Sequence, residues 1–176
     1  FTLDQYIFYG GYPGAASLIH DEDRFSQYIQ SAIIEATINK DILMDTPISK
    51  PALLRQTFEL GAAYSGEILS LNKMLGSLQD AGNTVTLASY INLLNESGLL
   101  CGLQKHSIDI ARRRASIPKL QVYNNALKMV YSPLAFEAAL VDRKSWGRIV
   151  ESCIGAYLVS QAFVHRFEVF YWRERD

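Results

Sequence analysis

The 176-residue sequence lacks the marks of several common protein classes. Its two cysteines, Cys101 and Cys153, stand far apart in apolar stretches, which argues against a disulfide framework and against a structural zinc site. Its three histidines have no acidic or cysteine companions at ligand spacing, so neither a zinc site nor a Ser-His-Asp arrangement is predicted. No Gly-x-x-x-x-Gly-Lys-Ser/Thr loop occurs, so nothing in this sequence can cradle a nucleoside triphosphate in that way.

The sequence also lacks an excess of either charge and any long apolar run. Lys and Arg number 17 and Asp and Glu 18, a net charge of -1, so any contact with nucleic acid must be local. No apolar run approaches the roughly 18 to 20 residues that span a bilayer, and no secretory leader is visible. We therefore expect a cytoplasmic protein without a membrane partner. The first residue is Phe1 rather than Met, which suggests a piece of a longer gene product.

The residues that are present predict a mainly α fold with small β elements. Hydrophobic residues make up 49% of the chain, enough for a core in one domain or two small ones. The glycines and proline within residues 10–14 predict a turn. Apolar periodicity predicts helices over residues 21–46, 51–64, 71–78, 84–96, 135–140 and 146–163, and strands over 99–104, 119–123 and 167–172.

Residues 50–123 have the order of a winged helix: helices, strand, loop, strand. The helix over 71–78, a turn containing Gly82 and the helix over 84–96 form the predicted helix-turn-helix. The second of these helices is expected to bury four residues of one seam: Val85, Ala88, Ile91 and Leu94.

Two groups of residues are candidates for contact with duplex DNA. The supposed reading helix should present polar side chains away from its seam: Asn83, Thr84, Thr86, Ser89 and Tyr90. The basic stretch of the wing should rest on phosphates through Arg112, Arg113, Arg114 and Lys119. The helix has no Lys or Arg and carries Leu87 on the same face, so a packing surface for another domain explains it equally well. The basic stretch also fits an ordinary solvated loop.

Six short motifs, in this order and spacing, resemble the C-terminal region of a family of predicted prokaryotic AAA+ superfamily ATPases. They are Tyr9-Gly10-Gly11-Tyr12-Pro13, Lys40-Asp41-Ile42, the helix-turn-helix ending at residues 89–100, Pro118-Lys119-Leu120-Gln121-Val122-Tyr123, Gly147-Arg148-Ile149-Val150-Glu151 and Tyr171-Trp172-Arg173. The resemblance implies a P-loop ATPase domain followed by a winged helix and a restriction-endonuclease-like fold of the PD-(D/E)XK type. Residues 1–49 would then link to the ATPase domain, and residues 124–176 would form part of an α/β nuclease-like domain.

The chain departs from that family pattern at the positions that carry chemistry. Asn124 and Asn125 stand where the family usually has an acidic residue, and the chain stops at Asp176, before the family's Glu-x-Asp strand. Glu151 is the remaining acidic position of a possible metal site, and one carboxylate cannot hold a catalytic magnesium ion. Glu151 therefore also fits an ordinary helical glutamate or the remnant of a degenerate site.

The sequence thus predicts the non-ATPase region of an ATP-binding protein, a winged-helix module that binds DNA or docks on its own ATPase domain. A metal-dependent nuclease and a stand-alone transcriptional regulator are the alternatives. No metal or cofactor site is expected in this chain, and ATP and magnesium would belong to the ATPase domain. The patterns leave open whether the chain is an enzyme and predict no oligomeric state.

Overall fold

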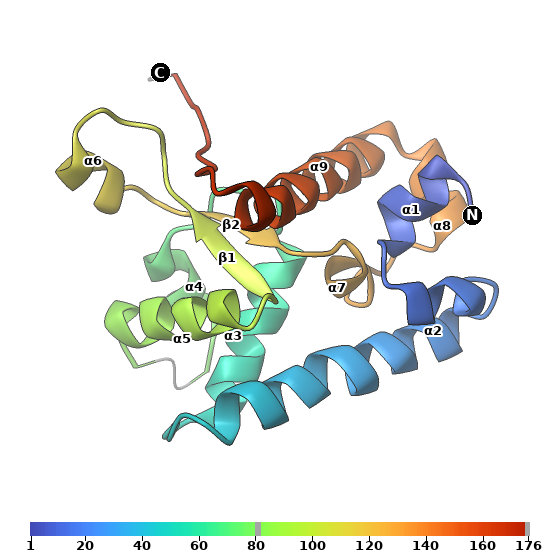
Figure 1. The fold of residues 1–176 in the computed structure, drawn as a ribbon, viewed down its shortest axis with the longest axis horizontal. Helices are drawn as coiled ribbons and strands as arrows, with labels where there is room; N and C mark the ends of the chain where they lie inside the picture. Colours follow the sequence, from blue (N-terminus) through green and yellow to red (C-terminus); the bar gives the residue numbers. More distant parts are fainter. Residues whose placement is uncertain (80–81, 175–176) are drawn as a thin grey trace.

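A computed structural model describes residues 1–79 and 82–174 and shows a mainly helical protein with one small antiparallel sheet (Figure 1). The helix α1 (Leu3–Tyr9) begins at a capping box, in which Thr2 and Gln5 bond each other's backbone amides. It ends at Gly10, whose φ of 72° suits glycine, and η1 (Pro13–Leu18) follows as a 3-10 turn. The predicted turn is confirmed, whereas α1 before it was not predicted.

A single continuous helix spans residues 22–43, as α2 (Glu22–Tyr28), η2 (Ile29–Glu35) and η3 (Ile38–Leu43). The Asp21 carboxylate caps its first turn by accepting from the Arg24 amide, and the helix ends before Pro47 as predicted. The last two segments have π-type hydrogen bonds, which widen the turn. In agreement with the wider turn, the core-facing residues recur every four or five positions: Phe25, Ile29, Ile34, Ile38 and Ile42.

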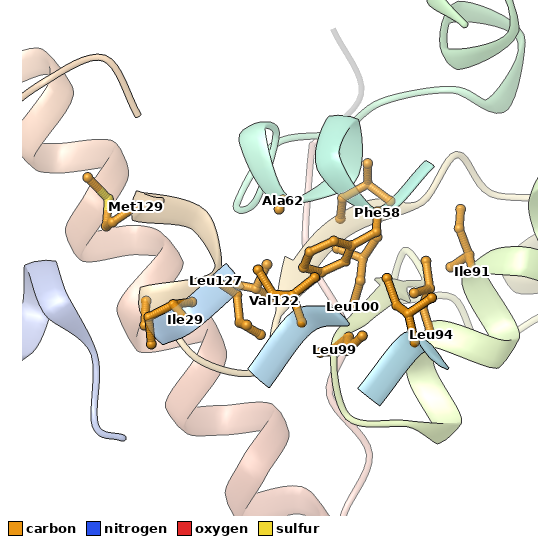
Figure 2. Packing of buried hydrophobic residues seen from close by; sticks show 14 of the residues in the cluster. Ile29, Phe58, Ala62, Ile91, Leu94, Leu99, Leu100, Val122, Leu127 and Met129 are labelled. Carbon is orange, nitrogen blue, oxygen red and sulfur yellow. The ribbon is translucent and has the colours of Figure 1, made fainter. Parts of the chain in front are cut away.

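The predicted winged-helix order is present. It consists of α3 (Pro51–Ala63), α4 (Leu71–Ser77), α5 (Thr84–Glu96), β1 (Leu100–Leu103), α6 (Ile110–Arg114) and β2 (Lys119–Val122). The strands pair antiparallel, with Leu100 opposite Val122 and Leu103 opposite Lys119. We call residues 104–118, between the two strands, the wing. Phe58 of α3 lies among Leu94, Leu100 and Val122, so the helices and the hairpin share one core (Figure 2).

The buried face of α5 differs from the predicted seam. Ile91 and Leu94 are buried as expected, but Val85 is 75% exposed and Ala88 is half-buried. Leu87 and Tyr90, predicted to point outward, are buried instead. Apolar residues occupy more than one side of this helix, so its periodicity is compatible with two rotations about the helix axis. Packing on α3, α4 and β1 favours the rotation that buries the larger side chains.

After the hairpin the chain forms α7 (Ala126–Met129), α8 (Phe136–Val141) and α9 (Arg143–His165). The predicted strand over residues 167–172 is wrong, because only one isolated parallel bridge forms there, between Lys105 and Tyr171. No strand is assigned within residues 124–174, so the α/β part of the predicted nuclease-like domain has no counterpart in the described residues.

Helix α9 packs on β2 through a buried polar seam as well as through apolar contacts. The Ser65 hydroxyl lies 2.8 Å from the Ser152 hydroxyl and accepts from the Val122 amide at 3.1 Å. The side-chain amide of Gln121 donates from Nε2 to the Ser152 carbonyl at 2.8 Å. Asn125 donates to the carbonyls of Ile7 in α1 and Ile149 in α9. Segments that are far apart in sequence are thus joined by hydrogen bonds inside the protein.

Candidate functional site

The exposed face of α5 is mostly polar, with Val85 as an apolar exception near its start and Glu96 as its one charge at the end. Asn83 caps the helix, and its side-chain oxygen accepts from both the amide and the hydroxyl of Thr86. Thr84 is half-buried, and Ser89 is exposed on the outer surface. Two of the predicted DNA-contacting residues therefore already use polar atoms in local capping, and their remaining surface offers hydrogen bonds without charge.

Tyr90 does not lie on the exposed face, contrary to the prediction. Its side chain is 6% exposed, and its hydroxyl donates to the Lys50 carbonyl at 3.5 Å. Tyr90 therefore contributes to the packing of α5 near the start of α3. The prediction failed because it took the phenol as polar, whereas the ring is large enough to be favoured in the core.

The three arginines of α6 have three different environments. The Arg112 guanidinium lies 3.5 Å from the Asp109 carboxylate, one turn earlier. The Arg113 guanidinium lies over the Phe170 ring, 5.1 Å from its centroid, and the side chain is half-buried. Arg114 is exposed. The sequence pattern predicted one basic patch, but the three side chains point in different directions from the helix.

Arg114 lines a groove between α5 and the wing, which we call the α5 groove. Its volume is about 340 Å³, and its lining includes Ala88, Asn92 and Asn95 of α5 and Gln104 and Arg114 of the wing. The Asn95 side chain also accepts from the Tyr123 hydroxyl at 2.8 Å. The groove thus combines neutral hydrogen-bonding groups with one exposed cation.

Lys119 and Glu151 form an ion pair with each other. The lysine side chain is only 19% exposed, so it is directed at α9 rather than outward as a phosphate ligand. The same contact occupies the carboxylate of Glu151. Among the described residues no group of three or more His, Cys, Asp or Glu side chains is placed to hold a metal ion.

Asn124 and Asn125, which stand where the resembled family usually has an acidic residue, form hydrogen bonds that hold the fold together. The Asn124 side-chain oxygen accepts from the amides of Gly11 and Ala126, which fixes the turn after β2 against the start of the chain. Asn125 is 2% exposed and bonded as described above. Nearby, Lys128 donates to the Ser65 carbonyl at 2.7 Å, and burial lowers the pKa of its ammonium group.

A larger cleft, about 1010 Å³, lies between the wing and the residues after α9; we call it the wing cleft. Its lining includes Lys105, His106, Arg112, Tyr171 and Trp172. Figure 1 shows the segment after α9 rising beside the wing. The sequence patterns placed the arginines on a DNA-binding wing and residues 167–172 in a strand, so they did not predict that the two segments form a cleft. The alternation of basic and aromatic residues was the available signal.

A family model for a domain of unknown function, DUF8612, matches residues 1–136. The chain belongs to the DUF8612 family. The match covers α1 through α7, so the winged helix lies wholly within this domain. No curated protein and no solved structure matches the chain.

Within residues 1–79 and 82–174, no helix of this DUF8612 protein is long and apolar enough to cross a membrane. This agrees with the absence of a long apolar run in the sequence.

Proposed function

We propose that this DUF8612 chain is a winged-helix module that binds duplex DNA through the α5 groove and the wing. The position of Arg114 carries this proposal, because it puts an exposed cation beside the polar face of α5. Residues 104–118 hold four basic residues, Lys105 and Arg112 to Arg114, against one acidic residue, Asp109. The wing is therefore locally positive in a chain whose net charge is -1.

The affinity of this surface for DNA should depend little on base sequence and strongly on salt concentration. The reading helix contributes uncharged groups such as Ser89 and Asn92, while the wing contributes charge. Phosphate contacts release counterions whatever the base sequence, so they determine affinity but not specificity.

The resemblance to AAA+ ATPases supports a wider proposal, in which this chain is the non-ATPase part of a larger ATP-binding protein. A second candidate function is then docking of the winged helix on an ATPase domain. Three exposed apolar side chains favour it: Val85 at 75%, Ile108 at 97% and Ile110 at 57% exposure. The nuclease alternative has less support, because within the described residues no group of three or more His, Cys, Asp or Glu side chains that includes Glu151 is placed to hold a metal ion.

The test measures affinity for a duplex of random sequence against salt concentration. We expect a linear fall of log affinity with log salt, and Arg114→Ala should reduce the slope by about 0.9, the loss of one phosphate contact. Arg24→Ala is the matched control, because Arg24 is exposed on α2, outside the wing and the α5 groove, and should leave the slope unchanged. Absence of binding at low salt would overturn the proposal and favour the docking function.

A further inference from the structure

A series of contacts between one cation and three rings leads from the wing to an exposed indole that lines the wing cleft. The guanidinium of Arg113 lies over Phe170, and the Phe170 ring centroid is 6.0 Å from that of His106. The His106 centroid is in turn 5.7 Å from that of Trp172, whose side chain is 71% exposed. The indole is thus supported by the imidazole of His106, while most of its surface remains open to a ligand.

Tyr171 fixes this series in place. Its amide donates to the Gln104 carbonyl at 3.1 Å, and its carbonyl accepts from the His106 amide at 2.8 Å. Its hydroxyl donates to the Ile117 carbonyl at 2.6 Å. Because Tyr171 is anchored at its amide, carbonyl and hydroxyl, its neighbours Phe170 and Trp172 are both held close to the ring of His106.

Three cations line the wing cleft together with the exposed indole, and one of them, Arg112, is paired with Asp109. The other two are Lys105 and Arg173, and Glu174 is the one acidic residue of the cleft lining. An exposed aromatic face beside cations binds two features of one ligand class: a flat nucleobase and the phosphate that follows it.

We propose that the wing cleft binds single-stranded nucleic acid, with an unpaired base stacked on Trp172 and the adjoining phosphates near Lys105 and Arg112. Bases inside a duplex have both faces covered by their neighbours, so only an unpaired base can stack on the indole. The wing cleft and the α5 groove share Ser116, and the wing supplies cations to both. Trp172 lines only the wing cleft and Arg114 only the α5 groove, so variants of these two residues distinguish single-strand binding from duplex binding.

The experiment uses tryptophan fluorescence and the chain described here. The sequence has two tryptophans, Trp146 and Trp172, so Trp146→Phe leaves Trp172 as the only reporter. An oligothymidylate of about twelve nucleotides should quench this fluorescence to saturation, whereas a blunt duplex of the same length should not. Free thymidine monophosphate tests whether the cleft binds a single nucleotide rather than a strand. It should quench the fluorescence only weakly.

A second measurement follows a labelled oligothymidylate by anisotropy. Trp172→Ala should weaken its binding roughly 5- to 150-fold, the range for loss of one stacked base, and Trp172→Phe should restore most of it. Duplex affinity should be unchanged in both variants, and Arg114→Ala should affect the duplex alone. Circular dichroism checks that the variants fold, as expected for an exposed residue.

Each result decides one proposal. Saturable quenching that depends on Trp172 supports single-strand binding even if the duplex does not bind. Duplex binding with no quenching by the single strand overturns the assignment of the wing cleft and leaves the proposed function intact. Equal quenching by thymidine monophosphate also overturns it, because the ligand would then be a nucleotide.

Discussion

The hydroxyl oxygens of Ser65 and Ser152 lie 2.8 Å apart in the protein interior, although 87 positions separate the two residues in the chain. Both are fully buried, at 0% exposure. Burial of a polar group is unfavourable unless it is hydrogen-bonded, so the two hydroxyls satisfy each other, and Ser65 also accepts from the Val122 amide. The contact joins the end of α3 to α9, and thereby joins the winged helix to a helix outside residues 1–136, the extent of the family match.

Substitution by alanine should have opposite effects on stability at two glycines of α9, Gly155 and Gly147. At Gly155 an added Cβ would lie 2.0 Å from the Gln121 side-chain oxygen, and Gln121 is 1% exposed and hydrogen-bonded within the seam. We expect Gly155→Ala to lower the free energy of unfolding by roughly 1 to 3 kcal/mol. At Gly147 nothing lies within 4 Å, so Gly147→Ala should raise it by about 0.5 to 1 kcal/mol through helix propensity.

Urea denaturation of the two variants checks this prediction. If Gly155→Ala is stabilising like Gly147→Ala, then α9 does not lie against Gln121 as described.

The rotation of α5 can be tested with two apolar residues on the same helix. Ile91 is 6% exposed, so Ile91→Ala should reduce the free energy of unfolding by roughly 2 to 4 kcal/mol. Val85 is 75% exposed, so Val85→Ala should change it by no more than about 0.5 kcal/mol. Chemical denaturation measures both values, and equal losses would indicate the seam that periodicity alone predicts.

Stability should fall at alkaline pH. Burial raises the pKa of Tyr123 and of Tyr131 to about 12, from an ordinary value of 10.0. A raised pKa means that the folded state holds the proton more tightly, so this contribution is complete below pH 10 and is lost as pH rises toward about 12. Thermal melting across this range should show the fall, and Tyr123→Phe should make it shallower. A fall of the same size in Tyr123→Phe would exclude Tyr123 as a cause.

The chain by itself should not bind ATP. The sequence contains no Gly-x-x-x-x-Gly-Lys-Ser/Thr loop, the motif whose backbone amides cradle the phosphates in P-loop ATPases. Calorimetric titration with Mg-ATP should give no saturable heat at millimolar nucleotide. A stoichiometric isotherm with micromolar affinity would contradict this, and with it the assignment of nucleotide chemistry to a separate ATPase domain.

Local patterns predicted the elements of the winged helix well. Pro51 begins α3, Asn83 caps α5, and Gly98, with a φ of 71°, ends it. These are local signals, in which one residue determines the backbone of its neighbours. The rotation of α5 was not predictable in the same way, because Val85 and Leu87 are both apolar and only the position of α3 and the sheet decides between them.

The candidate site was predicted in composition but not in geometry. Arg112, Arg113 and Arg114 are adjacent in sequence, yet one pairs with Asp109, one lies over Phe170 and one lines the α5 groove. The partners of Lys119 and Asn125 lie on α9, and those of Asn125 also on α1, so no local pattern reveals them. The strand predicted around Tyr171 failed because alternation of aromatics indicates a half-buried segment but does not supply a partner strand.

Tyr171 bonds to both legs of the wing, at Gln104 and His106 on one side and at Ile117 on the other. The loop between them is therefore closed at its base before any ligand arrives. A binding loop that is disordered when free loses conformational entropy on complex formation, and the observed affinity falls accordingly. Here the base of the wing is ordered during folding, so a ligand of the wing would not have to order that part of the backbone on binding.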